Sequence, residues 1–159
     1  MQPLTITLPS DREIQVTRSF AAPADVVFDC WTIPALIRRW LGPADWKFIT
    51  CEFDARIGGK WRFVTKGPNG FEMGSSGEVL ELTRPSWIKT TEIYDMDWTG
   101  GQTINTNAFT EADGVTTSLL TVLYSSKEAR DGARATPMAD GMEAGFRRLD
   151  ELLTDLPAY

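Results

Sequence analysis

The residue types that carry most enzyme chemistry are scarce in this sequence. Its 159 residues include no histidine, which excludes Ser-His-Asp and Cys-His catalysis, a histidine general base and every histidine metal ligand. The two cysteines, Cys30 and Cys51, are far apart and form no Cys-x-x-Cys pair. We therefore expect no zinc, no cofactor and no assignable catalytic residue. Any catalysis would rest on carboxylates, tyrosines, lysines, hydroxyls or a borrowed metal.

Two pairs of carboxylates have a spacing that suits acid–base work or the binding of a hard cation. Glu52 and Asp54 lie two residues apart in an expected strand and share one face, and Asp95 and Asp97 flank Met96 near an expected hairpin end. Exposed carboxylates of strands and loops are far commoner than paired catalytic ones. We therefore favour a solvent-exposed role for both pairs.

Two tyrosines and the two thiols each have a structural and a functional interpretation. Tyr94 and Tyr124 could place polar groups inside a cavity, although tyrosines at strand ends usually bond to backbone or water. Cys30 and Cys51 lie in apolar patterns. Buried thiols are inert unless their pKa is lowered, so we expect both to be structural.

The basic residues also have two interpretations, as contacts for an anionic partner or as solvent-exposed side chains. Arg38-Arg39 and Arg147-Arg148 lie on expected helices and could mark an anionic partner or ligand head group, but solvated helix faces explain them better. Lys60 is expected to pair with Asp54 and so order the turn between them. Three further arginines are expected as exposed cross-strand partners: Arg18, Arg56 and Arg62.

The strands that must position these side chains follow from a period of two in the apolar residues. Turn signals separate the segments: Gly58-Gly59, Pro68-Asn69-Gly70, Arg84-Pro85-Ser86, Gly100-Gly101 and Asp113-Gly114. Because such short connections permit only hairpins, the sheet should be antiparallel. The seven expected strands cover residues 13–20, 46–54, 60–66, 77–83, 87–94, 102–109 and 115–124.

Two short helices are expected after the first strand, over residues 23–31 and 34–41, each opened by a proline. A further short helix or turn covers residues 125–133. The C-terminal helix should begin with Thr136 as N-cap and Pro137 at its first position. Its apolar stripe consists of Met138, Met142, Gly145, Phe146, Leu149, Leu152 and Leu153.

The opposite face of this C-terminal helix is charged. Glu143 to Arg147 and Arg147 to Glu151 are spaced as i,i+4 pairs of opposite charge. The stripe therefore predicts that Phe146 and Met142 point toward the sheet, with Arg147 and Arg148 pointing outward.

Composition predicts the class of protein and excludes two kinds of partner. An apolar fraction of 42% and a charged fraction of 24% are typical of one globular domain, here residues 1–159. A net charge of −6 argues against nucleic-acid binding, and no apolar run approaches the ~20 residues of a membrane span. The N-terminus lacks the pattern of a secretory signal, so we expect a cytoplasmic protein with reduced thiols.

The order of elements and several motifs resemble a known family. These motifs are Phe20 to Pro23 leading into Val26 to Asp29 and Trp31-Thr32, Arg39-Trp40, Gly42-Pro43, Asp54 to Trp61, Gly77 with Val79 to Leu82, Arg84-Pro85, and Gly145 to Leu149. Over about residues 12–155 the chain is similar to the family named after the C-terminal domain of the activator of heat-shock-protein-90 ATPase, in the START-like or SRPBCC superfamily. The resemblance implies an α+β helix-grip fold, a curved seven-stranded antiparallel sheet around the long C-terminal helix, with a cavity between them. It supplies no catalytic residue that maps onto this chain.

Large rings are concentrated on the elements that must enclose such a cavity. An empty cavity of ~300 Å³ would cost about 7 kcal/mol, so a persistent one should hold water, a ligand or collapsed flexible side chains. Methionines suit collapse and reopening because they adapt their shape at little cost. Phe71 also belongs to the aromatic set, and core packing is the alternative for each residue. The predicted cavity-lining residues are Trp31, Trp40, Phe48, Trp61, Phe63, Met73, Met138, Met142 and Phe146.

The function expected from these observations is the binding of a small, largely apolar molecule in the internal cavity. Two alternatives belong to other classes. One is a cyclase- or hydrolase-type enzyme, which would need a titratable group inside the cavity. The other is a co-chaperone-like protein that binds a protein partner by its surface, with a homodimer also conceivable. The eukaryotic activators carry a second, N-terminal domain that this chain lacks, which weakens that alternative.

Overall fold

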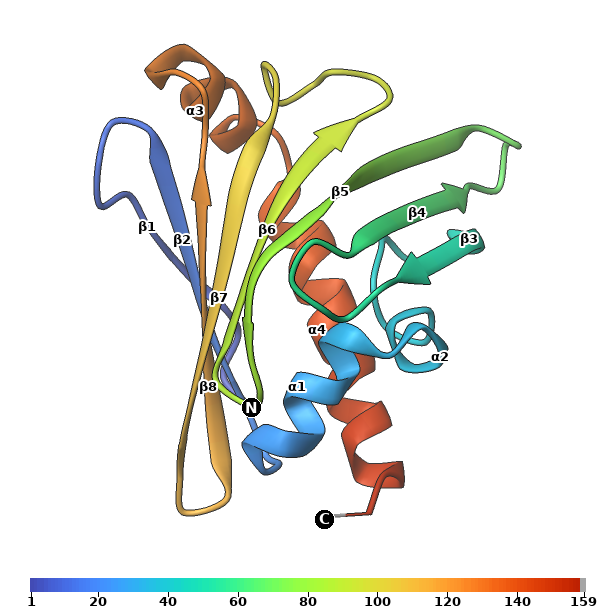
Figure 1. Cartoon of the computed structure of the whole chain (residues 1–159). Coiled ribbons are helices and arrows are strands. Elements are labelled where there is room, and N and C mark those ends of the chain that lie inside the picture. Colours follow the sequence, from blue (N-terminus) through green and yellow to red (C-terminus); the bar gives the residue numbers. More distant parts are fainter. Residues whose placement is uncertain (158–159) are drawn as a thin grey trace.

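An eight-stranded antiparallel sheet curves around one long helix (Figure 1). The computed structural model describes residues 1–157. Within them the elements are β1 (Thr5–Thr7), β2 (Glu13–Phe20), α1 (Ala24–Thr32), α2 (Pro34–Ile37), β3 (Lys47–Phe53), β4 (Lys60–Lys66), β5 (Glu72–Thr83), β6 (Trp87–Tyr94), β7 (Thr103–Ala112), β8 (Val115–Leu123), α3 (Lys127–Arg134) and α4 (Met138–Asp155).

The strand order is β1-β2-β8-β7-β6-β5-β4-β3, so the strands from β3 to β8 form a continuous meander. Short turns connect these strands, as predicted. Between β7 and β8, Asp113 and Gly114 both have positive φ, which is the conformation that a tight two-residue hairpin turn requires. The connection through α1 and α2 carries the chain from β2 to the far edge at β3. The antiparallel helix-grip architecture expected from the sequence is thereby confirmed.

The sheet differs from the prediction at two strands. β1 adds an eighth strand, pairing Thr5 with Thr17 of β2, and its three residues are too few to show a period. β5 begins at Glu72, five residues before the expected start at residue 77. Gly74 and Gly77 interrupt the alternation there, which hides the strand from a pattern based on side chains.

Two helix boundaries also differ. α2 ends at Ile37, and the next residues continue only as irregular turns. The N-cap of α4 is Pro137 rather than Thr136, with no side-chain hydrogen bond to the helix. The Thr136 hydroxyl instead donates to the carbonyl of Ala133 at 2.6 Å. Thr136 therefore terminates α3 and its turn instead of capping α4.

α4 lies across the concave face of the sheet (Figure 1). Phe146 is buried on its inner side, while the Arg147 side chain is 71% exposed and pairs with Glu143. This confirms the predicted orientation of both. Arg148 was expected to point outward, but it is half-buried and donates to the carbonyls of Trp40 and Gly42. Arg148 thus fastens α4 to the irregular end of α2.

Arg18 contradicts the expectation of an exposed cross-strand partner. Its side chain is only 1% exposed and bonds to Glu143 and Asp150 of α4 at 3.0 and 2.8 Å. Its guanidinium carbon also lies 5.1 Å from the ring centre of Phe20. Glu143 additionally accepts the backbone N–H of Leu4. The alternation of β2 places Arg18 on the inner face, where it joins β2 and the N-terminal segment to α4.

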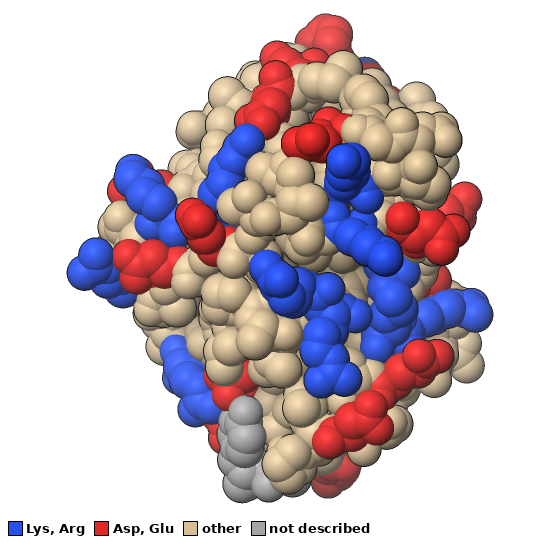
Figure 2. Space-filling view, turned by 90° about the vertical axis from the view of Figure 1, so that its right-hand side faces the viewer, with Lys and Arg blue, Asp and Glu red and all other residues tan. Residues whose placement is uncertain are grey.

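Two further ion pairs lie on the surface. Arg56 pairs with Asp54 at 2.8 Å, and Lys60 pairs with Glu78 at 3.0 Å. The side chains of Asp54 and Lys60 therefore do not pair with each other, but the backbone N–H of Asp54 donates to the carbonyl of Lys60 at 3.0 Å and closes the expected turn. On one face Lys and Arg side chains gather between acidic ones (Figure 2). The exposed basic residues of α2, β3 and β4 and their borders are Arg38, Arg39, Lys47, Lys60 and Lys66.

Candidate functional site: a cavity under α4

A cavity of about 680 Å³ lies between the sheet and the N-terminal half of α4. The cavity is partly open to solvent, so water fills it when no ligand is bound. Its size falls within the range of roughly 300–1,000 Å³ that small-molecule sites occupy.

Aromatic rings form the wall of the cavity near the helices. The rings of Trp31 and Trp40 lie 4.7 Å apart, and Trp40 stacks on Phe146 of α4 at 6.0 Å. The indole N–H of Trp40 donates to the backbone carbonyl of Cys30 at 2.8 Å. Because its polar atom is occupied there, Trp40 contributes apolar surface to the cavity.

A second aromatic cluster lines the wall that β3 and β4 form. The rings of Trp61 and Phe63 lie 4.8 Å apart, and Phe48 meets Phe63 edge to face at 5.7 Å. The indole N–H of Trp61 donates to the carbonyl of Thr91 at 3.1 Å. A Cβ at Gly77 would collide with both the Trp61 indole and this carbonyl. Glycine at this position is therefore what allows the indole to lie against the sheet.

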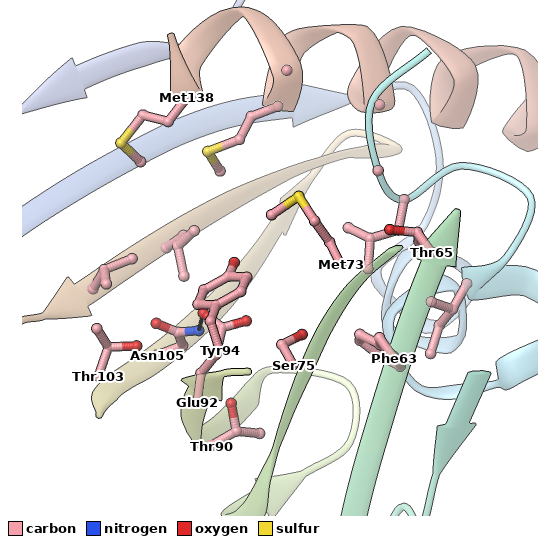
Figure 3. Close-up of a pocket in the computed structure, with 18 of the residues that line it drawn as sticks. Phe63, Thr65, Met73, Ser75, Thr90, Glu92, Tyr94, Thr103, Asn105 and Met138 are labelled. Atoms are coloured by element: carbon pink, nitrogen blue, oxygen red, sulfur yellow. Dashed lines mark hydrogen bonds between the residues drawn. The ribbon is translucent and has the colours of Figure 1, made fainter. Parts of the chain in front are cut away.

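Methionines complete the apolar lining. Met73 comes from β5 and Met138 from the first turn of α4 (Figure 3). Met142 follows one turn later on the same helix. All three are half-buried, which is consistent with side chains that face a space rather than a packed core.

The nine residues predicted from the sequence all line this cavity: Trp31, Trp40, Phe48, Trp61, Phe63, Met73, Met138, Met142 and Phe146. Their role in ligand binding stays a prediction. Phe71, the further ring of the aromatic set, is 48% exposed. It packs outside the cavity against Trp46, with 6.2 Å between ring centres.

One end of the cavity is polar, and the sequence analysis missed its central residue. Glu92 of β6 accepts a hydrogen bond from the side-chain amide of Asn105 at 3.1 Å, and the Tyr94 hydroxyl interacts with the same carboxyl group. Figure 3 shows Glu92, Tyr94, Asn105 and Thr103 grouped together on neighbouring strands. Within residues 1–157, Glu92 is the one charged side chain that lines the cavity.

Burial shapes the acid–base behaviour of this polar end. Glu92 and Tyr94 lie deep in the molecule yet keep accessible surface, because what they face is the cavity. Burial raises the pKa of Glu92, and the hydrogen bonds from Asn105 and Tyr94 offset only part of that. Burial and the nearby Glu92 raise the pKa of Tyr94 well above its ordinary value and that of Tyr124 to about 12.

Two buried polar atoms in this region have no hydrogen-bond partner, the hydroxyl of Thr103 and the amide oxygen of Asn105. Both residues line the cavity. Thr103 lies directly opposite Glu92 in the pairing of β6 with β7. Buried polar atoms are nearly always paired, and these two expose almost no surface in this structure. A molecule in the cavity would bond to them once their side chains turn toward it.

A sequence signal for Glu92 existed. In β6, Ile88 is buried, and a period of two from it places Thr90, Glu92 and Tyr94 on the same face. All four line the cavity. Tyr94 and Tyr124, considered from the sequence as cavity groups, are indeed among the lining residues.

The carboxylate pairs considered from the sequence are not at this site. Glu52 and Asp54 are exposed, Asp95 pairs with Arg62 at 2.7 Å, and Asp97 accepts the backbone N–H of Gly101. Across residues 1–157, no three His, Cys, Asp or Glu side chains come together as metal ligands would. The absence of a metal and of a cofactor stays a prediction.

Both thiols are buried and free. Burial raises the pKa of Cys30 to about 12 and also raises the pKa of Cys51. Because the thiolate is the reactive form, both cysteines are poor nucleophiles. In the part of the chain that the structure describes, no helix is long and apolar enough to cross a bilayer.

Comparison with known families identifies the chain. Residues 21–154 match the family described as Activator of Hsp90 ATPase homolog 1-like protein. The chain belongs to this family. The match spans the elements from the start of α1 to the last turn of α4, so it includes every wall of the cavity. No match to a curated protein was found.

Solved structures from bacteria share this fold. A protein from Rhodobacter sphaeroides is 34% identical, with a TM-score of 0.93, and the alignment covers 98% of this chain and 100% of that one. One from Staphylococcus epidermidis is 25% identical, with a TM-score of 0.82 and coverage of 98% and 97%. One from Mycobacterium smegmatis, at 22% identity, has a TM-score of 0.84 with coverage of 98% and 99%. The last shows likeness of fold alone.

Proposed function

We propose that this protein binds a small, largely apolar molecule in the cavity under α4. The observation that carries the proposal is a cavity of about 680 Å³ whose lining is mainly apolar and includes ten aromatic residues and three methionines. An apolar ligand would displace water from this lining, and the burial of apolar surface would stabilise the complex. The protein would act as one domain over its full length, in the cytoplasm.

Thermal unfolding tests the proposal with neutral aromatic probes, beginning with naphthylmethanol. A ligand that binds only the native state at a hundredfold excess over its Kd raises stability by about 2.7 kcal/mol. We expect such probes to raise the melting temperature of the wild-type protein.

Filling the cavity provides the matched control. One added ring occupies a small part of this space, so the double variant Met73→Trp/Met142→Trp narrows it from two walls. We expect this variant to fold and to lose the ligand-induced shift. Met96→Trp keeps the shift, because Met96 is 62% exposed and outside the cavity. If no probe shifts the wild type and the double variant is destabilised by the ~1–3 kcal/mol of overpacking, the centre is a solid core in solution and the proposal is wrong.

A specific observation favours an acid–base enzyme as the second candidate function. A cyclase- or hydrolase-type enzyme needs a titratable group in the cavity, and Glu92 with the two tyrosines Tyr94 and Tyr124 meets that need. Mass spectrometry of cavity-binding compounds after incubation would reveal turnover, which Glu92→Gln should abolish.

The co-chaperone alternative would be tested by direct stimulation of the heat-shock-protein-90 ATPase. A protein partner or homodimer stays a prediction.

A further inference from the structure

The polar end of the cavity has a chemistry that narrows the class of ligand. We propose that the ligand carries a protonated amine, which Glu92, Asn105 and Thr103 hold while its apolar body lies among the rings. This inference rests on the proposed function, because it describes the ligand of the same cavity.

Charge is the first step of the argument. Glu92 forms no salt bridge among the ion pairs of the described residues, and no Lys or Arg of residues 1–157 lines the cavity. The groups near Glu92 are neutral: Asn105 on β7, Tyr94 on its own strand and Tyr124 after β8. From α4 the cavity receives only uncharged residues, Met138 and Met142 among them. A carboxylate buried without a cation is costly, and a cationic ligand would remove that cost.

Hydrogen-bond capacity is the second step. An ammonium group has three donors and no acceptor. The polar end contains three oxygens that can accept: a Glu92 oxygen, the unpartnered amide oxygen of Asn105 and the unpartnered hydroxyl of Thr103. The last two are buried and reach a ligand when their side chains turn toward the cavity. Asn105 already uses its amide N–H₂ on Glu92, so its oxygen is the group left to bond. A ligand carboxylate would instead face Glu92 with like charge.

The shape of the lining is the third step. Trp40 and Trp61 direct their indole N–H groups to backbone carbonyls, so the walls away from Glu92 present mainly carbon. The cavity therefore separates one polar, acceptor-rich end from a large apolar remainder. An amine at the end of an aromatic or aliphatic body matches both parts.

Three probes with a shared body test this inference by isothermal titration calorimetry: naphthylmethylamine, naphthylmethanol and naphthoic acid. We expect the amine to bind at least about tenfold more tightly than the alcohol, since charge-assisted hydrogen bonds are roughly twice as strong as neutral ones. The acid should bind most weakly. Amine affinity should rise with pH as Glu92 loses its proton.

The isosteric variant Glu92→Gln should lose the preference for the amine while alcohol affinity changes less than about threefold. Glu81→Gln is the matched control, because Glu81 is an exposed glutamate outside the cavity. An amine that binds no better than the alcohol, or an amine preference that survives in Glu92→Gln, overturns this inference but leaves the cavity-binding proposal standing. Failure of all three probes to bind counts against the proposed function itself.

Discussion

The two halves of α4 cover two different interiors. The C-terminal half buries Leu149, Leu152 and Leu153 in a packed core with residues of β2 and α1. The N-terminal half holds Met138 and Met142 over the cavity. One continuous helix therefore packs against the hydrophobic core with its C-terminal half and lines the cavity with its N-terminal half.

The two halves of α4 differ in the side chains that they present to the interior. Leucine, with few rotamers, fills the packed half, whereas adaptable methionines and two small residues, Gly141 and Gly145, occupy the half over the cavity. This division assigns stability to one region and the space for a ligand to the other. Substitutions in the two halves should therefore have separable effects.

The largest expected effect is in the solid half. Leu149 is 0% exposed, so Leu149→Ala should lower the free energy of unfolding by about 3–5 kcal/mol, the upper part of the range for buried leucines. Met138→Ala, in the half over the cavity, should cost less than about 1 kcal/mol because its side chain already faces open space. Urea denaturation of the two variants measures both values. Equal losses would contradict the division.

Loss of the ion pairs of Arg18 with Glu143 and Asp150, one in each half of α4, should have the next largest effect on stability. Arg18→Ala leaves Glu143 and Asp150 without their buried cation and should cost about 3 kcal/mol. The matched control is Arg56→Ala, which removes a cation that is 77% exposed and should cost less than about 1 kcal/mol. Chemical denaturation compares them, and a small loss for Arg18→Ala would show that the network contributes little.

The smallest expected effect is a pH dependence of opposite sign at two glutamates. The folded pKa of Glu92 is raised by burial, so this residue lowers stability as pH rises above the ordinary glutamate range. Burial acts to raise the pKa of Glu143 as well, but hydrogen bonds from Arg18 and Leu4 outweigh it and lower that pKa. Glu143 therefore contributes stability above the ordinary range that is lost as pH falls through its lowered pKa.

Melting temperatures measured from acid to neutral pH separate the two. Glu92→Gln should gain stability relative to wild type toward neutral pH and match it in acid. Glu143→Gln should lose stability at neutral pH and approach wild type in acid. Parallel curves for the two variants would refute the assignment of opposite shifts.

Most of the fold could be predicted from the sequence because its elements are long enough to show their period. β2, β4 and β6 occupy the expected ranges. β1 was not predicted, because a strand of three residues shows no period and is defined only by its pairing with β2. The start of β5 was not predicted, because glycines carry no side chain that would show which face of the strand is buried.

The cavity walls could be predicted as a set of rings, but the polar end could not. A search for large apolar residues passes over Glu92, and Arg18 was read as exposed although the alternation that buries Val16 and Phe20 also places it inside. Charge was taken as a sign of exposure at Arg18, whereas Glu92 lay outside a search limited to apolar residues and paired carboxylates. The partners that make burial tolerable come from α4 for Arg18 and from β7 for Glu92, and those contacts arise only from the tertiary structure.

The two edge strands of the curved sheet affect whether copies of the chain can pair with one another. Within the described residues the two edge strands are β1 and β3, and edge strands can template pairing with another copy of the chain. β1 offers only three residues. β3 begins with Lys47, and its pairing with β4 shifts register between Phe48 and Thr50, which breaks the regular ladder. The β1 edge is short and the β3 edge is irregular, so both disfavour edge-to-edge pairing between copies of the chain.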